Sequence, residues 1–207
     1  MITPRPHIPS VLELHLPDWL TTLMADTPPR LISPEARMRF VLDLVRRQIE
    51  AGTGGPFAAA VFEHANGQLI AAGVNQVVPG RCSTAHAEIV ALTLAQQACD
   101  THDLGAEGLP AMELVASTEP CAMCLGAIPW SGVRRLLYGA YGSDAEAIGF
   151  DEGDKPAEWH AHLAARGITV QGGLLHPQAV ALLHAYVAAG GPIYNGRAIT
   201  AGQGRRI

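Results

Sequence analysis

Two short segments that lie far apart in the sequence constrain the fold of this chain more than any other feature. They are His86-Ala87-Glu88 and Pro120-Cys121-Ala122-Met123-Cys124. A proline that opens a predicted helix puts the two cysteines in one helical turn, where both thiolates can bind the same metal ion. Imidazole is another ligand that zinc accepts. If His86 binds the same ion, the fold must bring the starts of two helices together.

The residue types in these segments indicate catalysis by a metal-activated water. His86, Cys121 and Cys124 offer three ligands, and catalytic zinc sites keep a fourth position for water. A metal of this kind lowers the pKa of bound water from 15.7 toward about 7. Glu88 follows His86 by two residues, so it can lie beside this water without binding the metal. We predict that Glu88 moves protons from the water to a ring nitrogen and a leaving amine.

Other interpretations of the cysteines stay open. A Cys-x-x-Cys pair alone is more typical of a structural zinc site or a redox dithiol. A structural site uses four protein ligands, and the sequence offers no second Cys-x-x-Cys and no histidine pair at a suitable spacing. We therefore favour a catalytic zinc ion. Cys82 and Cys99 stand apart, so no disulfide framework is predicted and a reducing compartment is expected.

Charge and hydropathy restrict the partners of the protein. The 207 residues include fourteen Lys and Arg against nineteen Asp and Glu, which gives a formal net charge of −5. This charge provides no general attraction to a nucleic-acid backbone. We find neither a secretion signal nor an apolar run long enough to cross a membrane. The expectation is a cytoplasmic protein with neither a nucleic-acid nor a membrane partner.

The periodicity predicts an α/β domain over residues 33–196, preceded by a proline-rich extension over residues 1–32. A helix capped by Ser33 and ended by Gly52 is followed by two strands around Asn66-Gly67, a strong hairpin signal. The remaining predicted elements are a helix from Ser83 or Thr84 to Cys99, strands over 112–117 and 133–138 flanking a helix after Pro120, helices over 156–166 and 177–189, and a strand over 168–170.

At these segments the sequence resembles the cytidine-deaminase-like superfamily and, within it, the bacterial guanine deaminases. His-x-Glu with Pro-Cys-x-x-Cys is the signature of zinc-dependent nucleobase deaminases. The resemblance covers about residues 33–196 and includes the segments 55–61 and 146–151. It implies a three-layer helix/sheet/helix sandwich around a central mixed five-stranded sheet. It also implies one Zn²⁺ per subunit, a nucleobase substrate and a homodimer.

The resemblance also assigns residues to the substrate. Asn75 would hydrogen-bond the purine ring, Phe57 would lie against it, and Glu146 would contact the 2-amino region or assist proton transfer. Each residue has a structural alternative. Asn75 can be a turn residue, Phe57 an ordinary core residue, and Glu146 part of an exposed loop.

The end of the chain suggests how the site is closed. Guanine deaminases of this kind resemble domain-swapped dimers in which a C-terminal segment closes the neighbour's site. In residues 190–207, Gly190-Gly191-Pro192 can act as a hinge before Tyr194. A tail packed on its own domain is the alternative. Tyr194, Trp130 and Ala87 complete the candidate substrate contacts.

The leading functional prediction is hydrolytic deamination of guanine to xanthine and ammonia, in purine catabolism or salvage. Deamination of an amino-triazine or of cytosine is an alternative, because the metal and its ligands do not select the ring. Editing of adenosine in transfer RNA uses the same motifs on a flipped base, but no Lys/Arg-rich stripe supports it. A non-catalytic zinc protein is the fourth possibility, and it gives no reason for Glu88.

Overall fold

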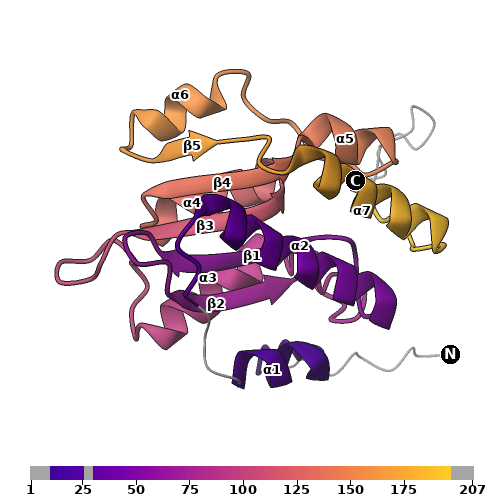
Figure 1. Cartoon of the computed structure of the whole chain (residues 1–207), viewed down its shortest axis with the longest axis horizontal. Coiled ribbons are helices and arrows are strands. Elements are labelled where there is room, and N and C mark those ends of the chain that lie inside the picture. Colours follow the sequence, from indigo (N-terminus) through magenta and orange to yellow (C-terminus); the bar gives the residue numbers. More distant parts are fainter. Residues whose placement is uncertain (1–9, 26–29, 197–207) are drawn as a thin grey trace, which may run out of the picture.

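A central five-stranded sheet organises the protein (Figure 1). The computed structural model describes residues 10–25 and 30–196. The spatial order of the strands is β2-β1-β3-β4-β5, with β1 antiparallel to β2 and β3, and with β3, β4 and β5 parallel. The strands are β1 (Ala58–Glu63), β2 (Leu69–Val74), β3 (Met112–Thr118), β4 (Arg135–Ala140) and β5 (Thr169–Gln171).

Helices cover both faces of this sheet, as Figure 1 shows, which confirms the predicted three-layer sandwich. Along β1, Ala59 and Val61 pack into a core with α3, α4 and α6, whereas Ala60 and Phe62 pack into a second core with α1, α2 and α7. The helices are α1 (Asp18–Ala25), α2 (Pro34–Ala51), α3 (Ala87–Ala98), α4 (Ala122–Ser131), α5 (Gly142–Ala147), α6 (Trp159–Ala164) and α7 (His176–Ala188).

Local signals in the sequence account for the first elements of the domain. The Ser33 hydroxyl oxygen accepts a hydrogen bond from the amide of Ala36 at 3.1 Å, and Gly52 ends α2 with a φ of +62°. In the hairpin, Gly67 has a φ of +69°, and a Cβ there would lie 2.1 Å from the carbonyl oxygen of Leu31. Glycine is therefore required at this turn.

Three helices differ from the sequence prediction. The helix predicted from Ser83 or Thr84 begins at Ala87, with His86 as its N-cap. Two helices were not predicted, α1 in the proline-rich extension and the six-residue α5. In α1 the side chain of Leu20 is fully buried, and this tertiary burial stabilises a helix too short to be stable alone. Residues 1–9 and 26–29 of the extension lie outside the described residues.

At one end of the sheet, β1 begins and β2, β3 and β4 end. Because β1 runs antiparallel to its neighbours, Ala58 pairs with Val74 at the end of β2, and Thr118 at the end of β3 pairs with Ala140 at the end of β4. The residues that follow or precede these ends therefore meet in space. Of the helices in the described part of the chain, none combines the length and the apolar composition of a membrane span.

Candidate active site

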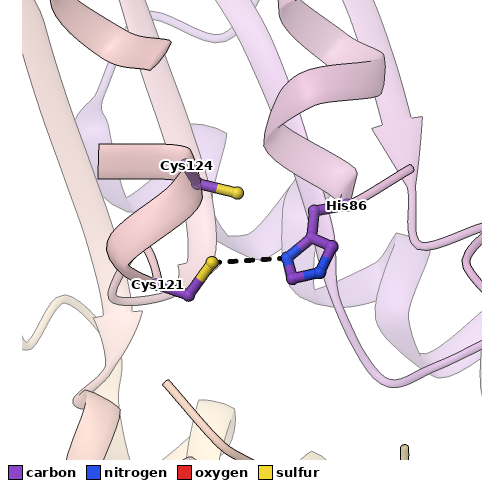
Figure 2. A group of neighbouring side chains, drawn as sticks. All are labelled: His86, Cys121 and Cys124. Carbon is purple, nitrogen blue, oxygen red and sulfur yellow. Dashed lines mark hydrogen bonds between the residues drawn. The ribbon is translucent and has the colours of Figure 1, made fainter. Parts of the chain in front are cut away.

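His86, Cys121 and Cys124 come together at this end of the sheet from the starts of two helices, as Figure 2 shows. His86 is the N-cap of α3 and Cys121 is the N-cap of α4. The Nδ1 atom of His86 lies 3.4 Å from the sulfur of Cys121, and the three ligand atoms all lie within 4.8 Å of one another. The amides at a helix start favour thiolate, so the local backbone already suits a cation site.

The geometry fits a zinc ion. Zinc–sulfur bonds of about 2.3 Å and zinc–nitrogen bonds of about 2.0–2.1 Å at tetrahedral angles put neighbouring ligand atoms about 3.5–3.8 Å apart. A hydrogen bond from the thiol of Cys124 lowers the pKa of Cys121 to about 4, while the same hydrogen bond raises the pKa of Cys124. The two sulfurs thus resist a second negative charge. A divalent cation between them removes that penalty and deprotonates both.

Glu88 lies in the first turn of α3, one residue inside the helix, and only 8% of it is exposed. Burial, together with the negative charge of Cys121, raises the pKa of its carboxyl group to about 7. A carboxyl group with a pKa near the working pH can both take and return a proton. Its place beside the metal ligands is the one that the sequence predicts.

These residues open onto a cavity of about 470 Å³. His86, Glu88 and Cys121 line one side of it. Phe57 and Phe150 line another side, with ring centroids 4.9 Å apart in an edge-to-face arrangement. An apolar cavity with a few polar groups is typical of small-molecule sites, and its volume suits a heterocyclic base.

Three buried polar atoms without hydrogen-bond partners in the described part of the chain belong to residues that line this cavity or lie next to it. The side-chain nitrogen of Asn75, the hydroxyl of Tyr194 and one oxygen of Glu152 are buried and have no hydrogen-bond partner among the described residues. The first two lie next to Gly55, where a Cβ would be 2.8 Å from the Tyr194 hydroxyl and 3.2 Å from Asn75 Oδ1. Unpaired buried polar groups cost stability, so a ligand is their natural partner.

Glu152 is a cavity residue that the sequence did not reveal. It is 6% exposed, and its backbone carbonyl accepts a hydrogen bond from the amide of Ala122 at 2.9 Å. This bond ties the loop to the start of α4 and carries the carboxyl group to the cavity. Burial raises the pKa of Glu152 to about 8, although Lys155 opposes the shift. The sequence places Glu152 in a Gly- and Asp-containing loop, where an acid is ordinarily exposed.

Three of the candidate substrate residues lie away from the cavity. Glu146 is exposed on α5, and Trp130 on α4 is 86% exposed. Ala87 is fully buried in the core, where its carbonyl oxygen would lie 2.6 Å from a Cβ at Gly73. None of the three lines the cavity, and Asn75, which lies beside Tyr194 at Gly55, is not among the lining residues either. Their substrate roles remain predictions, and the geometry offers Glu152 in the position expected of Glu146.

The described part of the C-terminal segment packs on its own domain. The side chain of Asn195 accepts a hydrogen bond from the amide of Asp151 at 2.9 Å and donates one to the carbonyl oxygen of Gly149 at 2.8 Å. Tyr194 consequently faces the cavity, and its ring is edge-to-face with Phe150 at 5.4 Å. Residues 197–207, the rest of the predicted swapped segment, lie outside the described residues.

Fold and site together define the class of the protein. Three ligands at two helix starts leave a coordination position for water, and a buried acid lies beside them in a helix/sheet/helix sandwich. This combination is that of a zinc-dependent deaminase, a hydrolase that acts on the C–N bond of a cyclic amidine. Residues 32–140 match the model of the cytidine and deoxycytidylate deaminase zinc-binding region, and the chain belongs to this family.

Relatives of known activity are similar over most of the chain. Guanine deaminase of Bacillus subtilis is 39% identical over 130 residues, which are 60% of this chain and 79% of that protein. The solved structure of guanine deaminase from Nitrosomonas europaea is 58% identical with a TM-score of 0.84, and the match covers 88% of this chain and 100% of that one. Another solved structure, in complex with 2,6-diaminopurine, is 60% identical with a TM-score of 0.85 and covers 89% and 97%.

Proposed function

We propose that this protein deaminates guanine to xanthine and ammonia in purine catabolism or salvage. The observation that carries the proposal is the junction of His86, Cys121 and Glu88 with an aromatic-walled cavity of about 470 Å³. The similarity to guanine deaminases supports the choice of purine. The net charge of −5 favours a free base over a nucleic acid.

Proton transfer falls to the two buried carboxyl groups. Zinc, when bound, supplies the Lewis acidity that makes water nucleophilic at neutral pH. In the proposed reaction, water adds to C2 of the purine and loses its proton to Glu88, which delivers a proton to the adjacent ring nitrogen. Glu152 donates a proton to the 2-amino group, so that the C–N bond breaks with ammonia as the leaving group, and it takes back the proton of the C2 hydroxyl as the carbonyl group of xanthine forms. Its unpaired oxygen and its place at the cavity support this role.

The remaining polar and aromatic groups orient the base. Asn75 Nδ2 is a buried donor that has no partner within residues 10–25 and 30–196, so it is suited to a carbonyl oxygen or ring nitrogen of the substrate. Phe57 and Phe150 form an apolar wall for the flat ring. Tyr194 covers the same cavity from the C-terminal segment. These contacts exclude bulk water from the reacting centre.

Ammonia release from a panel of amines tests the proposal. The panel contains guanine, guanosine, adenine, cytosine, an amino-triazine and a transfer RNA stem-loop. Guanine is expected to have the highest kcat/KM. Preference for the amino-triazine, cytosine or the stem-loop would reassign the substrate, and no release from any of them by zinc-loaded protein would support a non-catalytic role.

Matched substitutions test the two acids. Glu88→Gln, with zinc still bound, is expected to lower kcat by about 10²- to 10⁴-fold, the range of general acid–base catalysis. Glu152→Gln should lower kcat in the same direction. Glu146→Gln removes an exposed carboxyl group, and we expect its kinetics to match those of the unaltered protein. A loss of activity in Glu146→Gln instead of Glu152→Gln would reverse the assignment.

The proposal includes a cytoplasmic homodimer. All four cysteines are free, which fits a reducing compartment. Trp130 is 86% and Met123 37% exposed on α4, a helix without charged residues, and this apolar surface supports contact with a second subunit. Sedimentation should give the mass of two chains, and Trp130→Ser should shift the equilibrium toward one. A monomer at micromolar concentration would contradict the dimer. It would also contradict exchange of the 190–207 segment between subunits, because that exchange requires a dimer.

A further inference from the structure

The sequence contains a single lysine. Lys155 is one of fourteen basic residues, and all the others are arginines. Its side chain is 14% exposed, and it lies three residues after Glu152 in the loop that reaches the cavity. All the remaining basic positions of the chain are arginine, and its one lysine lies beside the candidate active site. The surroundings of this ammonium group give the reason.

The ammonium group of Lys155 is shared unequally between two carboxyl groups. Its Nζ lies 2.6 Å from Oε1 of Glu119 and 3.8 Å from Oε2 of Glu152. The first distance is a charge-assisted hydrogen bond, whereas the second leaves electrostatic attraction without a hydrogen bond. Oε2 of Glu152 therefore stays buried beside a positive charge and keeps its acceptor position free.

Glu119 is held firmly enough to anchor this arrangement. Its amide donates to the carbonyl oxygen of Ala140 at 2.8 Å, and its Oε2 accepts from the amide of Gly142 at 3.3 Å. Both contacts lie at the end of the sheet where β3 and β4 finish. Lys155 thereby links the acidic loop to a fixed part of the sheet, and the loop carries Glu152.

The space around Nζ is narrow on the side of Gly142. A Cβ at Gly142 would lie 2.6 Å from Nζ, closer than ordinary van der Waals contact. A guanidinium group is planar and wider than an ammonium group, and its several donors would reach both carboxyl groups at once. Arginine here would crowd Gly142 and occupy the free oxygen of Glu152.

We infer that Lys155 is a positioning residue, which pairs with Glu119 so that the carboxyl group of Glu152 is held at the cavity wall with one oxygen free for the substrate. The inference rests on the proposed deamination for the task of Glu152. Lys155 does not line the cavity, whereas its two partners Glu119 and Glu152 do, so it acts through these carboxyl groups and not on the substrate.

The test compares kcat and KM in Lys155→Ala, Lys155→Arg and the control Asp154→Asn. Loss of a residue that orients a catalytic group typically costs about 10- to 100-fold in activity. We expect this fall in kcat for both Lys155 variants, with KM within about twofold and zinc content unchanged. Asp154 is exposed on the same loop, and its variant should keep the original kcat. Gly142→Ala, which narrows the space for Nζ, should lower kcat in the same direction.

Rescue by a small amine separates positioning from a structural role. Methylammonium or ethylammonium should restore part of the kcat of Lys155→Ala, while the wider guanidinium ion should not. Unchanged kcat in Lys155→Ala would overturn the inference. So would loss of zinc or of thermal stability without rescue, because it would show that Lys155 only supports folding.

The substrate panel keeps this test distinct from the proposed function. If the unaltered protein releases ammonia from another heterocycle and not from guanine, guanine is the wrong substrate, and the same variants are compared on that heterocycle. Release by the unaltered protein with no kcat defect in the variants refutes the role of Lys155 alone. No release from any compound overturns both proposals.

Discussion

Buried polar groups are paired differently at the two ends of the central sheet. At the cavity end lie the unpaired atoms of Asn75, Glu152 and Tyr194, the three buried side-chain atoms without a hydrogen-bond partner among the described residues. At the opposite end, where β3 and β4 begin, Glu113 is fully buried and meets three partners. The polar atoms at the first end have hydrogen-bonding capacity left for a ligand, whereas the carboxyl group at the second end has its partners within the protein.

The completed end is built around Arg37. Its Nη1 lies 2.7 Å from Oε1 of Glu113, and its other nitrogens donate to the carbonyl oxygens of Leu31, Ile32 and His64 at 2.7, 3.1 and 3.0 Å. The guanidinium thus joins α2, the segment before it and the hairpin. These contacts lie away from the cavity, so we expect their loss to affect the stability of the fold more than catalysis.

Arg37→Met should have the largest effect on stability. Arg37→Met leaves Glu113 with Arg135 and His64 as partners and removes the donor of three carbonyl oxygens, and loss of one partner of a buried ion pair costs about 3–5 kcal/mol. Urea unfolding should show this loss, while kcat at a temperature where the variant is folded stays near the original value. Arg46→Met on the exposed side of α2 is the control and should change little. A large fall in kcat for folded Arg37→Met would show that this end of the sheet also affects catalysis, and it would contradict the comparison.

Removal of zinc should destabilise the cavity end alone. At free zinc a hundred times its dissociation constant, binding to the folded state adds about 2.7 kcal/mol. The melting temperature should therefore rise with zinc concentration in the unaltered protein and in Arg37→Met. Cys124→Ser removes a ligand and should lose this dependence. A zinc-independent melting temperature in the unaltered protein would speak against the site.

Asn75→Ala should separate binding from stability. Nδ2 has no partner among the described residues, but Oδ1 accepts a hydrogen bond from the amide of Val77 at 3.2 Å, so we expect the free energy of unfolding to fall by about 0.5–1.5 kcal/mol, the net value of one hydrogen bond. The KM for guanine should rise by a factor of about 5 to 150, which corresponds to about 1–3 kcal/mol. Asn66→Ala, in the turn at the other end of the hairpin, removes the acceptor for the Gln68 amide and should leave KM unchanged. Equal KM values for the two variants would contradict the role of Asn75.

The mildest test changes no residue and follows thiol reactivity in zinc-stripped protein. The lowered pKa of Cys121, about 4, keeps it a thiolate over the range from pH 8 to about pH 5, so its alkylation rate should hold across that range. Burial raises the pKa of Cys99, so its rate should fall about tenfold for each unit of decreasing pH. Peptide mapping by mass spectrometry separates the two. If the alkylation rates of both cysteines changed with pH in the same way, the pKa of Cys121 would not be lowered relative to that of Cys99.

Local patterns predicted much of the fold. The cap at Ser33, the Asn66-Gly67 turn and the apolar periodicity gave helices and strands close to those of the structure, because each depends on neighbours in the chain. The helix of α1 was missed because its stability depends on burial of Leu20 against residues distant in sequence. The start of α3 was placed too early because two capping residues precede His86, and packing on the sheet chose the later start.

The sequence by itself determined the metal ligands and predicted Glu88 beside them, since zinc chemistry allows few residue types and the short spacings within each segment fix their local geometry. Only the tertiary structure shows which other acid reaches the cavity. Glu152 and Glu146 are both loop-region acids in the sequence, but a backbone hydrogen bond to the start of α4 turns Glu152 into the cavity and α5 leaves Glu146 exposed. Lys155 likewise has meaning only beside Glu119, because long-range contacts set the charge and space around it.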